Sequence, residues 1–269
     1  MQNKLRQNQV IRLLAQNRML SVTDLARELA VSPATVRRDL QDMQQRGLLN
    51  RLHGGATIEG ISRVEPLFED KQDRHPEAKQ RIALAALELI SDGDRIYLDG
   101  GSTVLALARL LDRKRRLVIV SNSLMAAAEL MNTEHRLILV GGEFRSLSRT
   151  LVGPLTAPLV NSLRVDLAFM GTIGFSLADG MTTTDPAEAF TKELVMQRAA
   201  RVVLLADHSK FGVTSFARSG SLDDIDVLVT DAAEDNLRLD LERRGITVRL
   251  AGPANGLTDT QPPNDKGNA

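Results

Sequence analysis

The sequence has no cysteine and no tryptophan among its 269 residues, and it has a single tyrosine. Without cysteine, the chain forms no disulfide, no thiolate metal site and no cysteine nucleophile. Aromatic residues make up only 3% of the chain, while its hydrophobic content of 43% is ordinary. This balance predicts a globular protein with an aliphatic core.

Long apolar runs are also missing. No run approaches the roughly 20 residues that a membrane-spanning helix needs. The first ten residues, MQNKLRQNQV, lack the apolar core of a signal peptide. We therefore expect a cytoplasmic protein without a membrane partner, long enough for one small and one larger domain.

The chain has no net charge, but its charges are unevenly distributed. Nine basic minus four acidic residues give +5 up to residue 57, which leaves −5 for the remainder. A basic head on an acidic body predicts that the head alone binds a phosphate backbone. The uneven charge alone also fits a head whose basic surface is exposed to solvent and has no phosphate partner.

The head, residues 1–57, has the pattern of a winged helix-turn-helix. Apolar residues at helical spacing predict a first helix over residues 4–16. Ser21 is followed three residues later by a carboxylate and predicts the start of a short second helix. Ser32 and Pro33 then open a third helix, because serine caps helices and proline is tolerated at their first position.

The third helix, residues 33–45, directs Val36, Leu40 and Met43 toward a core. Its remaining surface is polar and basic, as in a helix that enters the major groove of DNA. Residues 48–56 follow as a short β-hairpin, the wing. The predicted DNA contacts lie at the start and on the outer face of this helix and in the wing: Ser32, Ala34, Thr35, Arg37, Arg38, Gln41, Arg51 and His53.

The stretch SVTDLARELAVSPATVRRDLQDMQQRGLLNRLHGGA closely resembles the DNA-binding signature of the DeoR family of bacterial regulators. In that signature, a V-S-x-x-T-[VI]-R-R-D-L recognition helix precedes R-x-H-G-G-A. The resemblance implies binding to double-stranded DNA at an operator. For any one arginine, a plain solvent-exposed charge remains an alternative, and His53 fits a packing role as well as a phosphate contact.

Residues 58–75 are polar and charged and predict a linker. Residues 76–252 then alternate between helical and strand-like segments. This order predicts an α/β domain with a mostly parallel sheet and helices on both faces. Strands are expected at residues 95–98, 117–120, 137–140, 165–170, 201–206, 227–230 and 247–250. Helices are expected at residues 77–90, 103–111, 124–131, 154–163 and 186–199.

Polar or glycine-rich turns follow five of the predicted strands, among them DGGST from Asp99 and DHSKFG from Asp207. Ligands of open parallel sheets bind at the carboxyl ends of the strands. The two glycines and two hydroxyls of the first turn open a helix and suit a phosphate dianion, although such a turn is equally common as a plain connection. Lys210 adds a cation at the fifth strand end.

The body resembles the sensor domain of the same family in the segments LDGGST, VSNS, VGG, GTIG, DGMTT and DHSKFG, and the resemblance spans residues 3–252. That sensor domain in turn resembles ribose-5-phosphate isomerase. The resemblance implies a phosphorylated sugar as effector, with phosphate contacts at Gly101, Ser102 and Thr103 and a ligand contact at Lys210. The predicted ligand-binding set comprises strand-end and nearby polar residues: Asp99, Gly100, Gly101, Ser102, Thr103, Asn122, Gly171, Thr172, Glu188, Lys192 and Lys210.

Two alternatives remain open. One is a sugar-phosphate isomerase with a DNA-binding head, which needs a carboxylate base beside its substrate. The isomerases carry the acidic segment D-G-A-D-E where this chain has MGTIG, so we expect no enzyme activity. The other alternative is a body that serves only as an oligomerisation scaffold. Glu188 and Lys192 also fit a surface i, i+4 pair.

We therefore expect a DNA-binding transcriptional regulator, by resemblance a repressor, that is relieved by a phosphorylated sugar. One small head offers few base contacts, which predicts a homo-oligomer. The four histidines are scattered, so we expect no metal site, and we expect no cofactor. The tail, residues 253–269, has a composition typical of disorder.

Overall fold

The computed structural model describes residues 6–7, 9–10, 13–14, 17, 19–45, 49–52, 54–57 and 65–252. The chain divides into two compact units, Met1–Pro66 and Leu67–Ala269. The predicted DNA contact His53, residues 58–64 of the predicted linker, and the predicted disordered tail from residue 253 lie outside the described residues. No helix among the described residues is both long and apolar enough to cross a membrane.

The first unit is a winged helix-turn-helix, as predicted. The first segment is helical at each of its described residues, which are 6–7, 9–10, 13–14 and 17. The remaining elements are β1 (Met19–Ser21), α2 (Val22–Glu28), α3 (Pro33–Gln45), β2 (Asn50–Leu52) and β3 (Gly55–Thr57). The wing strands β2 and β3 are antiparallel, and β1 joins them on the other edge of β3.

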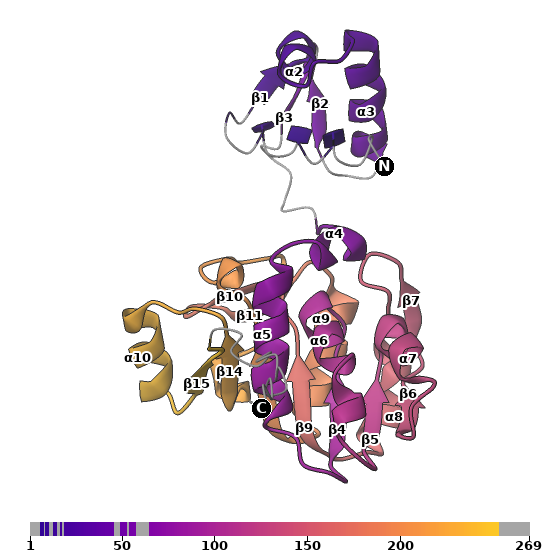
Figure 1. Cartoon of the computed structure of the whole chain (residues 1–269), viewed down its shortest axis with the longest axis vertical. Helices are drawn as coiled ribbons and strands as arrows, with labels where there is room; N and C mark the ends of the chain where they lie inside the picture. Colours follow the sequence, from indigo (N-terminus) through magenta and orange to yellow (C-terminus); the bar gives the residue numbers. More distant parts are fainter. Residues whose placement is uncertain are drawn as a thin grey trace, which may run out of the picture. The chain divides into compact units, whose positions relative to one another are not determined.

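The second unit is built on a seven-stranded parallel sheet (Figure 1). Its strand order is β15-β14-β12-β9-β4-β5-β6. The strands are β4 (Arg95–Leu98), β5 (Val118–Ser121), β6 (Arg136–Leu139), β9 (Val165–Met170), β12 (Ala199–Leu205), β14 (Val227–Thr230) and β15 (Thr247–Leu250). All six pairings are parallel, which confirms the predicted α/β class.

Helices cover both faces of this sheet (Figure 1). One face packs against α5 (Pro76–Leu87), α6 (Ser102–Ala108) and α7 (Leu124–Leu130). The other face packs against α8 (Ala157–Asn161), α9 (Pro186–Met196) and α10 (Asp235–Arg243). In β4, Ile96 and Leu98 enter the first core and Tyr97 the second, because successive side chains of a strand point to opposite faces.

Several elements were not predicted. The helix α4 (Phe68–Gln72) lies within the segment that the sequence predicts as a linker. It forms because Phe68 is buried in the core, a single apolar anchor among charged residues. The other unpredicted elements are the hairpin β7 (Glu143–Arg145) and β8 (Thr150–Val152), the small sheet β10 (Gly174–Ser176), β11 (Gly180–Thr183) and β13 (Ala217–Gly220), and α10. Their strands hold only three or four residues, too few for a clear alternation of apolar and polar positions.

Candidate functional site

The helix α3 separates an apolar face from a basic one. Val36, Leu40 and Met43 are fully buried in the core of the first unit, at the spacing that the sequence predicts. Four predicted DNA contacts are exposed on the remaining surface of α3: Ala34, Arg37, Arg38 and Gln41. A basic helix face held outward by an apolar core is the geometry of a recognition helix.

Ser32 and Thr35 form the amino-terminal cap of α3. The Ser32 Oγ accepts a hydrogen bond from the Thr35 backbone N–H at 3.2 Å, and the two hydroxyl oxygens lie 2.9 Å apart. Ser32 is exposed and Thr35 is half-buried. Both predicted DNA contacts therefore also stabilise the start of the helix, since a serine cap satisfies a backbone N–H that the helix leaves free.

The acidic residues of α3 are engaged within the unit. Asp39 is buried and forms an ion pair with Arg6, with the Arg6 Nε 2.5 Å from the carboxylate. Asp42 accepts a hydrogen bond from the Gln7 side chain at 2.8 Å. Among the described residues, Arg37 and Arg38 make no ion pair, so their charges face solvent. Arg51 of the wing strand β2 is exposed as well.

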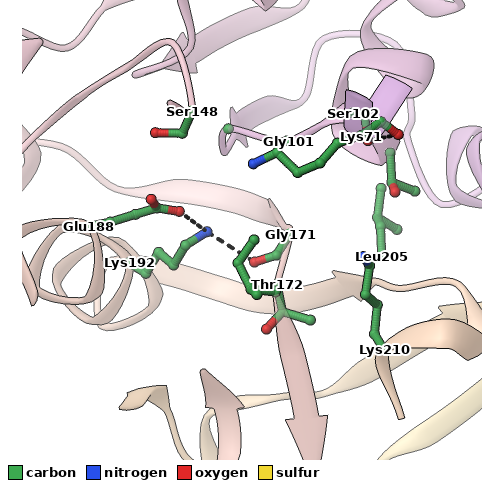
Figure 2. A pocket seen from close by; sticks show the side chains of 13 residues that line it. Lys71, Gly101, Ser102, Ser148, Gly171, Thr172, Glu188, Lys192, Leu205 and Lys210 are labelled. Atoms are coloured by element: carbon green, nitrogen blue, oxygen red, sulfur yellow. Dashed lines mark hydrogen bonds and ion pairs between the residues drawn. The ribbon is translucent and has the colours of Figure 1, made fainter. Parts of the chain in front are cut away.

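The second unit contains a pocket at the carboxyl ends of β4, β9 and β12 (Figure 2). This is the edge where the sequence predicts a ligand. Residues from several segments line the pocket: Lys71, Gly100, Gly101, Ser102, Thr103, Ser148, Gly171, Thr172, Ile173, Glu188, Lys192, Leu205 and Lys210.

Glycine is required at two places in the pocket wall. Gly101 has a φ of 124°, a conformation that residues with a side chain rarely adopt. At Gly171, a Cβ atom would lie 2.9 Å from the carbonyl oxygen of Gly100. The loops that follow β4 and β9 therefore approach each other closely because position 171 lacks a side chain, while Gly101 provides the positive φ of the turn.

A buried ion-pair network forms one wall of the pocket. The Lys192 amine forms an ion pair with Asp99 and donates a hydrogen bond to the Gly171 carbonyl at 3.0 Å. Lys192 also lies 3.7 Å from a carboxylate oxygen of Glu188, whose other oxygen is 3.2 Å from the Arg145 guanidinium. The Asp99 carboxylate in turn accepts the Gly171 N–H at 2.9 Å. Each of the three buried charges thus has an opposite charge beside it, as burial requires.

Lys71 and Lys210 also line the pocket, and both interact electrostatically with the buried amine of Lys79, which does not line it. Burial lowers the pKa of the Lys79 amine to about 8. The Asp207 carboxylate opposes this shift. The positive charges of Lys210, Arg74 and Lys71 add to it.

Lys210 responds to the same surroundings. Burial lowers the pKa of Lys210, Asp207 opposes the shift, and the charges of Lys71 and Arg74 add to it. Lys79 and Lys210 therefore each interact with the cations Lys71 and Arg74 and with the Asp207 carboxylate, so positive charge predominates around these two amines. This excess of positive charge in a half-enclosed pocket favours an anion.

The pocket gathers nine of the eleven predicted ligand-binding residues, which come from three strand ends and α9. Asp99 and Asn122 do not line it. Asp99 instead fixes Lys192, and Asn122 is buried with its amide donating to the Leu151 carbonyl at 3.1 Å in β8. The sequence missed Lys71 and Ser148, because both lie in segments whose secondary structure was not predicted.

The alternative of a surface pair for Glu188 and Lys192 is wrong. Glu188 is 7% exposed and Lys192 is 2% exposed. Glu188 and Lys192 are an i, i+4 pair on α9. This face of the helix points toward β4 and β9, where the Lys192 amine contacts Asp99 and Gly171. The described residues hold no group of three or more histidine and acidic side chains placed to bind a metal.

Comparison with known proteins identifies both units of the chain. Residues 6–60 match the family model of the DeoR-like helix-turn-helix domain, and residues 74–232 match that of the DeoR C-terminal sensor domain. The HTH-type transcriptional regulator GlpR of Haloferax volcanii is 36% identical over 245 residues, which cover 90% of this chain and 96% of that protein. The glycerol-3-phosphate regulon repressor of Escherichia coli is 34% identical, covering 84% of this chain and 90% of its own length.

Among solved structures, ribose 5-phosphate isomerase A of Methanocaldococcus jannaschii resembles this chain with a TM-score of 0.38 and 21% identity. The match covers 51% of this chain and 54% of the isomerase, about half of each. The two domain matches and the relatives aligned over nearly their whole length establish the family. The chain belongs to the DeoR family of transcriptional regulators.

Proposed function

We propose that the protein is a DNA-binding transcriptional repressor of an operon for sugar use, and that a phosphorylated sugar bound in the pocket changes its affinity for the operator. The observation that carries the proposal is the pocket itself. In a domain of the DeoR sensor family, it combines the glycine- and hydroxyl-containing turn of Gly100–Thr103 with the amines of Lys71 and Lys210. Backbone N–H groups, hydroxyls and lysines are the usual partners of a phosphate group.

The head binds the operator through α3. Thr35, Arg37 and Arg38 read base edges in the major groove, while Arg51 and His53 contact the phosphate backbone. The repressor direction follows the relatives, of which one is named as a repressor of the glycerol-3-phosphate regulon. Two heads are needed for a site of useful length, so the active form is a homo-oligomer on a repeated or palindromic operator.

The effector acts through its different affinity for two arrangements of the protein, since a ligand shifts an equilibrium only by that difference. Binding of the phosphorylated sugar favours the arrangement with weaker DNA affinity and releases the repressor. Such regulation takes place in the cytoplasm, where phosphorylated sugars and operators meet.

The pocket serves for binding and not for catalysis. The two carboxylates nearest to it are engaged by cations, Asp99 by Lys192 and Glu188 by Lys192 and Arg145. A carboxylate fixed in this way supports the pocket wall and is not placed to carry a proton between substrate carbons. Incubation with pentose and hexose phosphates, followed by separation of the sugar products, should yield no isomer above background.

The experiment that tests the proposal is fluorescence anisotropy of the full chain on labelled DNA from upstream of its own gene. The complex is titrated with phosphorylated sugars and with the unphosphorylated form of each. We expect one phosphorylated sugar to weaken DNA binding while its unphosphorylated form does not. Tight DNA binding that is indifferent to every phosphorylated sugar would contradict the sensing role and favour the scaffold alternative.

A further inference from the structure

Lys210 lies at the end of a turn that is too short to fix its own orientation. The turn is the 3₁₀ helix η3 (His208–Lys210), which follows β12. Asp207 caps it and accepts hydrogen bonds from the Ser209 hydroxyl and from the Ser209 N–H, the latter at 3.1 Å. A single 3₁₀ turn closes few backbone hydrogen bonds, so its orientation depends on contacts with neighbouring elements. The direction of the Lys210 amine depends on the same contacts.

One of these contacts comes from the neighbouring strand β14. Asp231 directly follows β14, and its carboxylate accepts two hydrogen bonds from His208. The His208 backbone N–H donates one at 2.9 Å, and the imidazole Nδ1 forms the other at 2.8 Å. The His75 ring, one residue before α5, contacts the His208 ring edge to face, with 5.4 Å between the ring centres. His208 is therefore held by two elements other than its own turn.

Asp231 is ionised and acts only as an acceptor. Its side chain is 6% exposed, and the Arg81 guanidinium of α5 lies 3.8 Å from the carboxylate. Burial acts to raise the pKa of Asp231, but the hydrogen bonds from His208 outweigh burial and lower this pKa below its usual value. Since a carboxylate has no proton to give, the His208 imidazole donates from Nδ1. Both bonds to Asp231 are thus charge-assisted, the stronger class of hydrogen bond.

The chain beyond Lys210 is fixed by a different strand. The Phe211 ring packs edge to face on the Phe175 ring of β10, with 6.0 Å between the ring centres. The N–H of Gly212 donates to the Phe175 carbonyl at 2.9 Å. Lys210 therefore lies between two fixed points, His208 on one side and Phe211 on the other.

Asp231 and His208 can affect a ligand only through the position of Lys210. Lys210 lines the pocket, but in the described part of the chain neither of these two residues does. The Asp231 carboxylate would also repel a phosphate group. A binding group must be held within about 0.5 Å of its productive geometry, and an amine on a loosely held turn does not meet this condition.

We propose that Asp231 is a positioning residue of the effector site: through His208, it fixes the turn that presents Lys210 to the phosphate group of the effector. The inference rests on the proposed function, because it takes Lys210 as a phosphate contact. It adds a residue at the end of β14, a strand that supplies no residue to the pocket wall in the described chain. The sequence predicts Lys210 but neither Asp231 nor its pairing with His208.

The test is hydrogen–deuterium exchange with mass spectrometry on the full chain, titrated with inorganic phosphate at constant ionic strength maintained with chloride. Peptides that cover residues 99–105 report on the proposed phosphate turn, and peptides that cover residues 206–212 report on the turn of Lys210. In the wild type, we expect phosphate to slow exchange in both regions with the same midpoint concentration.

Two variants of His208 separate the hydrogen bond from the bulk of the side chain. His208→Ala removes the imidazole donor. It should speed exchange in residues 206–212 without phosphate and raise the phosphate midpoint about fivefold or more, because a charge-assisted hydrogen bond is lost. His208→Asn places an amide N–H close to the position of Nδ1 and should bring the midpoint back to within about twofold of the wild type. The His208 side chain is 51% exposed, so both variants should fold.

A second pair of variants tests Asp231 itself. Asp231→Asn leaves only neutral hydrogen bonds to His208, which are about half as strong, and should raise the phosphate midpoint about threefold or more. The matched control is Asp226→Asn at the opposite end of β14. Asp226 also accepts a backbone N–H from the neighbouring strand, that of Val202 at 2.7 Å, but it lies at the other edge of the sheet. The control should leave the midpoint unchanged.

The outcomes separate the inference from the proposed function. If His208→Ala loosens residues 206–212 but leaves the midpoint unchanged, or if His208→Asn weakens phosphate binding as much as His208→Ala, the inference fails while the phosphate site stands. The inference also fails if Asp226→Asn raises the midpoint as much as Asp231→Asn, or if phosphate protects only residues 99–105 of the wild type. If phosphate protects neither region of the wild type, the phosphate site and the inference fail together.

Discussion

The two units of the protein place their charges in opposite ways. In the head, Arg37 and Arg38 lie on the outer face of α3, with solvent around them. In the sensor unit, Asp99 and Lys192 are nearly inaccessible to solvent and neutralise each other in the pocket wall. A charge on the surface costs little to keep, whereas a buried charge costs several kcal/mol unless an opposite charge compensates it. The head therefore keeps Arg37 and Arg38 exposed to solvent, and the sensor uses a buried ion pair as part of its pocket wall.

This difference predicts that the two units respond differently to the loss of a charge. Removal of an exposed arginine from the outer face of α3 should change DNA binding and leave the free energy of unfolding nearly unchanged. Removal of a basic residue from the pocket wall should change stability first. Three experiments follow from this contrast, and they are arranged by the size of the effect that we expect.

The largest effect is expected for Lys192→Met. The variant leaves the Asp99 carboxylate buried without its cation, which should lower the free energy of unfolding by about 3–5 kcal/mol. Urea denaturation followed by circular dichroism measures this loss. The control is Arg95→Gln, which breaks an ion pair with Asp166 in which Arg95 is 58% exposed and should lower the free energy of unfolding much less than Lys192→Met does. A loss in Lys192→Met no greater than that of the control would refute the structural role of the buried pair.

A smaller effect is expected for Arg37→Gln and Arg38→Gln, measured separately. Each should weaken operator binding by about 1–3 kcal/mol if the side chain reads a base edge. The free energy of unfolding should stay within about 0.5 kcal/mol of the wild type, because both side chains are exposed. Anisotropy on operator DNA and urea denaturation of the same preparations test both statements. Unchanged DNA affinity for either variant would remove that arginine from the proposed readout.

The smallest effect is expected for the pH dependence of effector binding. The free protein holds the pKa of Lys79 at about 8, so this amine loses its proton as the pH rises from 7 to 9. A bound phosphate favours the protonated amine and raises its pKa, so the affinity for a phosphorylated sugar should fall by up to about tenfold over this range. The phosphate group itself stays a dianion there, since its second pKa is near 6.

Isothermal titration calorimetry at several pH values measures this fall. Lys79→Met has no amine to titrate, so its affinity should change less with pH than that of the wild type. A wild-type affinity that is constant between pH 7 and 9, or a variant that retains the full pH dependence, would show that Lys79 does not contribute to the charge of the pocket.

The sequence predicts much of this architecture because the signals are local. The strands β4, β9, β14 and β15 have the predicted bounds, since each is a short segment with β-branched or other apolar residues between polar turn segments. The turn residues of the pocket were also predicted, because the carboxyl ends of parallel strands meet at one edge of the sheet. Gly100–Thr103, Gly171 and Lys210 thus lie together as expected.

The remaining features depend on contacts that are distant in the sequence. Asp99 and Lys192 are separated by 93 positions, and no spacing rule indicates that the lysine turns inward to meet the carboxylate. Lys71 lies in a charged segment that resembles a linker, and only the burial of Phe68 makes it a helix of the pocket. Asn122 was predicted as a ligand contact because it follows a strand. Its side-chain amide instead donates a hydrogen bond to the Leu151 carbonyl in the hairpin strand β8.

The central claim is that the first unit binds DNA and that the second unit changes the DNA affinity when it binds the phosphate group of a sugar. The most direct measurement is the operator affinity of Lys210→Ala, by anisotropy, with and without the phosphorylated sugar that weakens DNA binding of the wild type. The account predicts that the variant binds DNA like the wild type and no longer responds to the sugar. A variant that still responds normally, or whose operator affinity falls as much as that of Arg38→Gln, would contradict the division of roles between the two units.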